Sequence, residues 1–273
     1  MGRPPGSRRH RGRVMTGRLA IEIVGFGRMG RAVARAAAER GHRVVAVRTR
    51  QGLRTPEGAP LSAAPRPDVA IEFTCAESAP GLVEELLDAR VPVVSGTTGC
   101  EAAMRDLAAV ARRRGVGFLW APNFALGVLV MFRLARTAAA VLGTRVDFSP
   151  YLVEHHHAGK RDAPSGTARR LAEIVLDRTP RLERAGPVPE EGPAPPDLLP
   201  VAWIRAGAVP GTHELGWEGP GESLVLRHVC RDRSVFARGA VAAAEWLRGQ
   251  DGPRSADEMI EAWLEGRGEG GQR

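Results

Sequence analysis

Short apolar runs alternate with amphipathic stretches along the first half of the chain. Residues 19–24 form an apolar run with β-branched side chains, which predicts a strand, and the Ala-rich stretch at 31–40 predicts a helix that stops at Gly41. Further strands are expected at 43–47, 68–74, 91–95 and 116–120, with helices at 79–90 and 101–114. Strands that alternate with helices predict an α/β fold with a doubly wound parallel sheet of Rossmann type.

The second half of the chain has a different pattern, in which strands predominate. A strand at 145–155 precedes a helix at about 166–176, and residues 178–199 are dense in Pro, Gly and Glu, which predicts a loop. The other elements are strands at 201–205, 211–217 and 222–229, a long helix at about 127–142, and helices that end near 247 and 265. This order predicts a second α+β domain with an open mixed sheet.

A glycine-rich loop follows the first strand and opens the first helix. A Gly-x-Gly-x-x-Gly loop in that context is typical of dinucleotide binding. Gly25 allows the tight turn, Gly27 lets the backbone approach a pyrophosphate, and Gly30 lets helix and strand pack closely. We predict that every residue of the loop contacts the cofactor: Gly25, Phe26, Gly27, Arg28, Met29 and Gly30.

The end of the second strand indicates which cofactor is preferred. An NAD-binding domain usually has an acid at this place, whereas this chain reads Val-Arg-Thr-Arg from Val47. Arginine suits a 2′-phosphate, so we predict NADPH as the preferred cofactor, with Arg48 as a contact and NADH as a possible substitute. The alternative is that Arg48 and Arg50 are solvated loop charges.

Two more strand ends are candidates for cofactor contacts. Ligands of doubly wound sheets bind beyond the carboxyl ends of the strands. The segments that follow the strands at 68–74 and 91–95 lie at such ends, and both carry hydroxyl side chains. The residues predicted to contact the cofactor there are Phe73, Thr74, Gly96, Thr97 and Thr98.

Residues 154–168 read EHHHAGKRDAPSGTA and combine three kinds of group in one short stretch. Imidazole can donate a proton near neutral pH, and an ammonium group attracts carboxylates. The Pro-Ser-Gly-Thr sequence opens a helix whose first N–H groups are unpaired. The stretch therefore predicts a site for a small acid that must be protonated. A metal bound by the histidines with Glu154 or Asp162 would leave Lys160 unexplained, so we predict no metal.

The same stretch resembles the signature of the dihydrodipicolinate reductases, His-His-x-x-Lys-x-Asp-Ala-Pro-Ser-Gly-Thr-Ala, at every fixed position. The resemblance extends from about residue 19 to 247 and includes the family's Ala-Pro-Asn-Phe segment at 121–124, with Ala125 in place of the following serine. It implies the reduction of dehydrated 4-hydroxy-tetrahydrodipicolinate to tetrahydrodipicolinate in the diaminopimelate route to lysine. It also implies a homotetramer, with the open sheet face as an interface.

The resemblance assigns roles to individual residues. His156 is expected to be the general acid, and Lys160 to bind the substrate and to support proton delivery. Asn123 is expected near the nicotinamide amide of the cofactor. Ser165 is expected to cap its helix, so that the neighbouring amides face a carboxylate. The residues expected to contact the cyclic dicarboxylate are His157, Lys160, Ser165, Gly166 and Thr167.

Composition narrows the cellular setting of the chain. Hydrophobic residues make up 43% and charged residues 26%, and no apolar run approaches the ~20 residues that span a bilayer. The three cysteines are too far apart for a zinc site or a disulfide framework, so we expect free thiols in the cytoplasm. Six of the net +8 charges come from arginines at 1–18, which leaves +2 for the rest.

These features divide the chain into four segments. We expect a disordered basic tail at 1–18, a dinucleotide-binding domain at 19–123, a substrate-binding and oligomerisation domain at 124–234, and helices at 235–273 that return to the first domain. The tail has no aromatic residues to stack on bases, so we expect no nucleic-acid binding. Met15 is an alternative start of translation. Two other functions stay open: a reductase of a related cyclic imine or unsaturated diacid, and a cofactor-bound regulatory protein.

Overall fold

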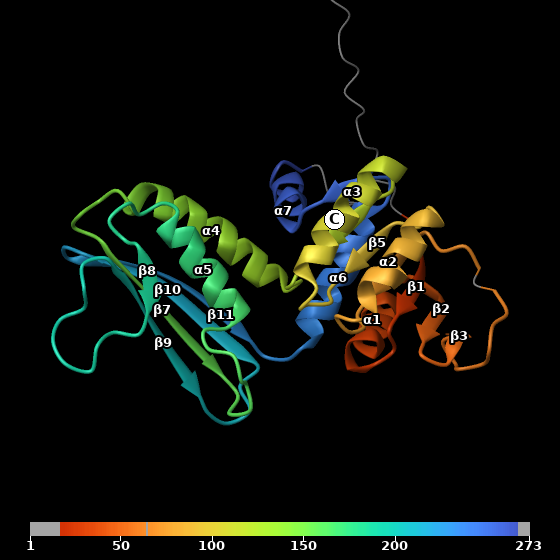
Figure 1. The fold of residues 1–273 in the computed structure, drawn as a ribbon, viewed down its shortest axis with the longest axis horizontal. Coiled ribbons are helices and arrows are strands. Elements are labelled where there is room, and N and C mark those ends of the chain that lie inside the picture. Colours follow the sequence, from red (N-terminus) through yellow and green to blue (C-terminus); the bar gives the residue numbers. More distant parts are fainter. Residues whose placement is uncertain (1–16, 64, 267–273) are drawn as a thin grey trace, which may run out of the picture. The chain divides into compact units, whose positions relative to one another are not determined.

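The chain is divided into two compact units in a computed structural model that describes residues 17–63 and 65–266. The first unit holds the chain up to Trp120 and again from Val241, and the second runs from Ala121 to Ala240 (Figure 1). The sequence pattern placed these boundaries after residues 123 and 234. Residues 1–16 of the expected tail lie outside the described residues.

The first unit is built on a seven-stranded sheet in the order β12-β6-β5-β4-β1-β2-β3. Every neighbouring pair is parallel except β2 with β3. Because β1 lies between β2 and β4, the strand order reverses at β1, and doubly wound sheets bind ligands at such a point. The strands are β1 (Ala20–Val24), β2 (Arg43–Thr49), β3 (Gly52–Arg54), β4 (Val69–Glu72), β5 (Val93–Ser95), β6 (Phe118–Trp120) and β12 (Pro253–Arg254).

Helices cover the sheet of the first unit and bury its apolar runs. Ile23 and Ile71 on the central strands are fully buried, which explains why these strands read as apolar runs rather than as an alternating pattern. Helices α2 and α3 pack together over a core that includes Phe118. The helices of this unit are α1 (Arg28–Glu39), α2 (Ala79–Asp88), α3 (Glu101–Arg114) and α7 (Ala256–Leu264). It also includes α6 (Ser234–Leu247) from Val241 onward.

The second unit has a five-stranded mixed sheet in the order β11-β10-β7-β9-β8. Helices α4 (Leu126–Leu142) and α5 (Gly166–Leu176) pack on one face of it (Figure 1). Leu152, Leu171 and Trp217 are fully buried between the two layers. The strands are β7 (Ser149–His156), β8 (Arg184–Gly186), β9 (Leu198–Arg205), β10 (Gly211–Gly219) and β11 (Glu222–Cys230).

The opposite face of this sheet is accessible and includes exposed apolar side chains. Successive strand residues point to opposite faces, so residues that alternate with the buried ones point away from the helices. Ile204, Val225 and Val229 are among them, and they are 50%, 44% and 52% exposed. The expected open mixed sheet is therefore confirmed.

The sequence pattern was wrong about two segments. The stretch at 178–199 is not entirely a loop, since it contains β8, which pairs with β9 in parallel. The strand expected from residue 145 begins only at Ser149, because the preceding residues form a turn. Strands of two or three residues, such as β3, β8 and β12, are too short to show an alternating pattern.

The described residues also bear on membrane and redox chemistry. No helix among them is long and apolar enough to cross a bilayer. Cys75, Cys100 and Cys230 are all free thiols, and Cys230 is buried.

Candidate active site

The glycine-rich loop has a geometry that only glycine allows at two positions. Gly25 has a φ of 90°, and a Cβ there would lie 2.2 Å from the carbonyl oxygen of Phe73. A Cβ on Gly30 would lie 2.0 Å from the carbonyl oxygen of Gly25. A Cβ on Gly27, in contrast, would meet no atom within 4 Å, so the backbone there is open to a ligand.

Helix α1 begins within this loop, at Arg28, and presents an uncapped end. Its N-cap is Gly27, which has no side chain to bond the first N–H groups, and its first turn contains no acid. Uncapped N–H groups and the positive end of the helix dipole attract phosphate groups. The loop and the start of α1 therefore fit the pyrophosphate of a dinucleotide.

The ends of β4 and β5 are joined by polar contacts. Thr97 is buried and donates its hydroxyl proton to Glu72 over 2.7 Å, and the N–H of Thr74 also reaches Glu72 over 2.6 Å. The ring of Phe73 lies against Gly96, where a Cβ would be only 2.1 Å from it. Thr98 is exposed. The five residues predicted from the strand ends are thus brought together at the carboxyl edge of the sheet.

Arg48 has two carboxylate partners in this structure. Its Nε donates to Glu22 over 2.9 Å, and a terminal nitrogen donates to Glu85 over 2.7 Å. Arg48 lies opposite Val24 of β1, but its side chain bonds Glu22, which comes two residues before Val24 on that strand. The side chain therefore points away from the carboxyl edge. Arg48 therefore offers less charge to a phosphate than the sequence suggested, whereas Arg50 is exposed beyond the strand.

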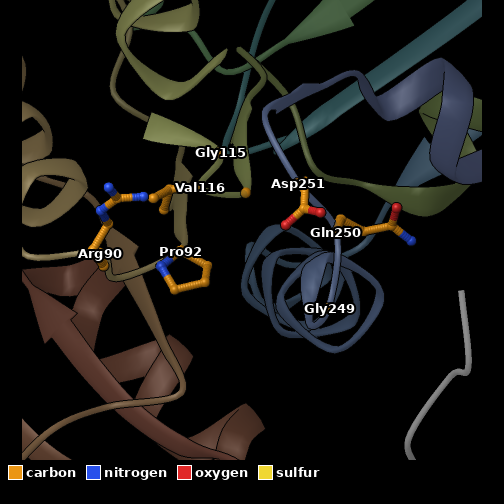
Figure 2. Close-up of a pocket in the computed structure, with 8 residues that line it drawn as sticks. Arg90, Pro92, Gly115, Val116, Gly249, Gln250 and Asp251 are labelled. Atoms are coloured by element: carbon orange, nitrogen blue, oxygen red, sulfur yellow. The ribbon is translucent and has the colours of Figure 1, made fainter. Parts of the chain in front are cut away.

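A cavity of about 370 Å³ in the first unit does not coincide with these residues (Figure 2). It lies before the amino ends of β5, β6 and β12, at the sheet edge opposite the glycine-rich loop. Arg90 and Asp251 lie on opposite sides of it. Because ligands of such sheets bind at the carboxyl ends, this cavity is not the expected dinucleotide site.

Strand β7 of the second unit carries two candidate functional side chains on its buried face. Glu154 is 0% exposed and His156 is 7% exposed, whereas His155 and His157 are half-buried. His156 therefore faces the helices and His155 the other side, as the alternation of side chains along a strand requires. A Cβ on Gly211 would lie 3.0 Å from Nε2 of His156, so the ring packs closely against β10.

Glu154 is the centre of a buried polar cluster. It accepts hydrogen bonds from the N–H of Ser165 and from the guanidinium group of Arg205, and Nε2 of His213 lies 3.5 Å from it. Burial alone would raise the pKa of Glu154, but hydrogen bonds from His213, Ser165 and Arg205 outweigh it and hold that pKa well below its ordinary value. Glu154 is therefore an anion that ties β7, β9, β10 and the start of α5 together.

His156 is neutral in the ligand-free protein near pH 7. Its Nδ1 lies 3.5 Å from Glu154 and is buried without a hydrogen-bond partner. Burial, together with repulsion from His213, Lys160 and Arg205, lowers the pKa of His156 to about 4, and the attraction of Glu154 offsets only part of this. A nearby anionic ligand would raise the pKa again and so supply the ring with a proton.

Lys160 and the first turn of α5 provide positive charge next to this cluster. Nζ of Lys160 donates to Asp162 over 2.7 Å, and the side chain of Lys160 is 22% exposed. Ser165 caps α5, because its Oγ accepts the N–H of Ala168 over 3.2 Å and also lies 3.0 Å from His213. The hydroxyl of Ser165 is thus fully used, and the exposed Gly166 leaves the first amides of the helix accessible.

Asn123 orients the hydroxyl of Thr167. The amide N–H of Ala125 donates to Oδ1 of Asn123 over 2.8 Å, which fixes which end of the side-chain amide is oxygen. Nδ2 must then donate to Oγ1 of Thr167, 3.2 Å away. The sequence placed Asn123 near the nicotinamide amide, whereas here its side chain is bonded within the second unit.

Arg205 and His213 were not predicted as site residues. They lie more than 50 positions after Glu154, and only the pairing of β7 with β9 and β10 brings them to it. Side-chain donor atoms of Glu154, His156 and His213 all lie within 4.8 Å of one another, a spacing that a metal could bridge. The guanidinium group of Arg205 already occupies Glu154 and would repel a cation there.

Comparisons with known proteins agree with both halves of this description. The chain matches the family described as "Dihydrodipicolinate reductase, N-terminus" over residues 19–124 and that described as "Dihydrodipicolinate reductase, C-terminus" over residues 127–260. A 4-hydroxy-tetrahydrodipicolinate reductase of Christiangramia forsetii is 32% identical over 86% of this chain and 94% of that protein. An enzyme of the same name from Anaeromyxobacter dehalogenans is 39% identical over 69% of this chain and 70% of its own.

A solved structure shares the fold. The dipicolinate-bound dihydrodipicolinate reductase from Paenisporosarcina sp. TG-14 has a TM-score of 0.71, with 88% of this chain and 98% of that chain covered, at 22% sequence identity. The amine dehydrogenase of Mycobacterium smegmatis is more distant, with a TM-score of 0.52, 15% identity, and 91% and 97% of the two chains covered.

Proposed function

The chain belongs to the dihydrodipicolinate reductase family, which confirms the resemblance of its signature, and on this premise we propose that it reduces 4-hydroxy-tetrahydrodipicolinate, in its dehydrated form, to tetrahydrodipicolinate. The reaction belongs to the diaminopimelate route to lysine and uses NAD(P)H as reductant. The Rossmann-type unit with its glycine-rich loop supports the use of a dinucleotide.

One observation in the second unit carries this proposal. A neutral, buried His156 lies beside Lys160 and close to the first amides of α5, which the Ser165 cap on Ala168 leaves accessible. A cyclic dicarboxylate satisfies all three, because one carboxylate binds Lys160 and the helix amides while its charge favours protonation of the histidine. Lys160 is paired with Asp162 in the ligand-free protein, so a neutral substrate would add no negative charge to favour protonation of His156.

Each candidate site residue of the second unit has a defined part in the proposed reaction. Lys160, the amide of Gly166 and the hydroxyl of Thr167 hold a carboxylate, and His157 lines the substrate. Bound NAD(P)H supplies the hydride that reduces the ring. His156 then donates the proton that completes the reduction, and Glu154 holds the imidazole against β10. The hydroxyl of Ser165 acts indirectly, as the cap that keeps the amides of α5 in place.

We further propose that NADPH is preferred over NADH. No carboxylate follows β2 to bind the ribose hydroxyls, and the segment carries Arg50 instead. Since Arg48 is already paired with Glu22 and Glu85, Arg50 is the better candidate for the 2′-phosphate. Arg28 is exposed at the start of α1 and supplies a second positive charge.

The assembly we propose is a homotetramer that uses the open face of the five-stranded sheet. Ile204, Val225 and Val229 form an exposed apolar face on strands β9 and β11. Apolar sheet surfaces with an accessible edge favour association with another chain. Sedimentation of the purified protein tests this proposal, since Val225→Lys should dissociate a tetramer into smaller species.

The proposed reaction is tested by measuring NADPH and NADH oxidation with substrate generated in situ from pyruvate and aspartate semialdehyde by a synthase. Oxidation that depends on the synthase is expected, and His156→Gln should lower turnover by ~10²–10⁴ while NADPH binding is preserved. Cofactor binding without synthase-dependent oxidation would contradict the proposed substrate and direct the search to other cyclic unsaturated acids.

A further inference from the structure

A buried carboxylate lies where the cofactor-binding edge of the first unit begins. Glu72 is the last residue of β4, and its side chain is 0% exposed. Four donors reach its two oxygens over 2.5–2.7 Å: the N–H and the hydroxyl of Thr74 and the hydroxyl of Thr97 at Oε1, and the hydroxyl of Ser95 at Oε2. Neither the glycine-rich loop nor the signature at 154–168 accounts for this residue.

The arrangement decides the direction of the hydrogen bonds. Oε1 of Glu72 is met by the amide N–H of Thr74 and by two hydroxyl groups, so it accepts all three. The other oxygen, Oε2, accepts from the hydroxyl of Ser95. The hydroxyl protons of Thr74 and Thr97 therefore both point into the protein.

A hydroxyl group that already donates its proton to one partner can only accept further hydrogen bonds. Thr97 Oγ1 already accepts the N–H of Thr74 over 3.0 Å, which leaves one lone pair, and Thr74 Oγ1 keeps two. The loop that holds them is also fixed from β6, because the indole N–H of Trp120 donates to the carbonyl oxygen of Thr97 over 2.8 Å. Both oxygens thus have fixed positions and a fixed polarity.

We propose that Glu72 is a positioning residue that turns the hydroxyls of Thr74 and Thr97 into acceptors for a donor group of the dinucleotide, a ribose hydroxyl or the carboxamide N–H. This proposal rests on the dinucleotide use in the proposed function and adds the residue that sets the polarity of the contact. What matters in Glu72 is the acceptor oxygen Oε1 and not its charge.

Two variants of Glu72 separate the acceptor role from charge and from fold. Glu72→Gln keeps an acceptor oxygen at the position of Oε1 when its NH₂ group faces Ser95. The hydroxyl of Ser95 then accepts from this NH₂ group instead of donating to a carboxylate oxygen. Glu72→Met has a similar length and no strong acceptor, so it releases both threonine protons. Each purified full-length variant is titrated with NADPH and with NADH by the change in cofactor fluorescence. Binding of dipicolinate, measured by calorimetry, reports on the second unit as the matched control.

The expected result is a split between the two glutamate variants. Glu72→Gln should bind NADPH within about threefold of the parent, whereas Glu72→Met should bind it about tenfold more weakly, the cost of roughly one hydrogen bond. Dipicolinate affinity should be unchanged in both. Equal NADPH affinity for Glu72→Met and the parent would overturn the proposal, and an equal loss in both variants would show that charge, not the acceptor, matters.

A pair of Thr97 variants keeps the test decisive if Glu72→Met does not fold. Thr97→Ser retains the hydroxyl and should bind NADPH within about threefold, whereas Thr97→Val lacks it and should lose about tenfold. Parent-like binding by Thr97→Val would overturn the proposal. Because these titrations need no turnover, a protein that binds NADPH but fails to reduce the proposed substrate would contradict the proposed function and leave the role of Glu72 standing.

Discussion

Substrate binding should draw a proton onto His156. The pKa of this ring is lowered to about 4 in the ligand-free protein, chiefly by burial and then by the charges of its neighbours. Only about one ring in a thousand is then protonated at pH 7. A dicarboxylate adds negative charge to a cluster that otherwise contains Lys160, Arg205 and His213 against Glu154. The acid needed for the reaction is therefore formed by the substrate itself.

The size of the effect follows from Coulomb's law. One carboxylate about 4 Å from the ring, at an effective dielectric constant of about 20, stabilises the imidazolium by about 4 kcal/mol, or about three pKa units. The pKa of His156 in the complex is then about 7. Binding at pH 7 should take up about half a proton per site, and the association constant should fall up to tenfold per pH unit as the pH rises from about 5.5 to 7.

Calorimetry with dipicolinate measures this uptake directly. The observed binding enthalpy is plotted against the ionisation enthalpy of each buffer, and the slope gives the number of protons taken up. This slope should be about one half for the parent protein and about zero for His156→Gln. Because the pKa rises on binding, uptake should vanish well above pH 7. A parent protein that binds dipicolinate with no buffer dependence and no pH dependence between 5.5 and 7 would refute this reasoning.

Four further substitutions test single contacts. Lys160→Ala should raise the KM of the substrate about 10- to 100-fold by removing a charge-assisted bond, and an unchanged KM would place the carboxylate elsewhere. Asn123→Ala should raise that KM about threefold to tenfold with unchanged NADPH affinity; weaker NADPH binding instead would favour the contact that the sequence suggested. Arg50→Gln should lower the NADPH to NADH ratio of kcat/KM about tenfold and Arg48→Gln less, and the reverse order would restore Arg48 as the phosphate contact.

The fold and the position of the site could be predicted because their signals are local. The start of α5 at Gly166 follows from the sequence Pro-Ser-Gly-Thr, and Ser165 caps it as expected. The strand that delivers His156 and the face on which this residue lies follow from a period of two. Gly25 and Gly30 were identifiable because close backbone contacts leave no room for a side chain there.

The partners of the site residues could not be predicted, because they come from strand register. Arg205 lies beside His156 and His213 beside Glu154 only through the pairing of β7 with β9 and β10. The direction of Arg48 had a similar cause. Its position at the end of β2 was clear, but Glu22 on the neighbouring strand draws the side chain away from the carboxyl edge. Register and side-chain direction depend on long-range packing that no local pattern records.

The hydroxyl residues show why a residue type alone does not define a contact. Threonine can donate or accept, and the neighbour decides which. In the first unit Glu72 takes the protons of Thr74 and Thr97, so these oxygens can only accept further hydrogen bonds. In the second unit Asn123 donates to Thr167, which leaves that hydroxyl proton for a carboxylate. Exchanging acceptor for donor beside such a threonine should therefore alter ligand affinity as much as removing the threonine itself.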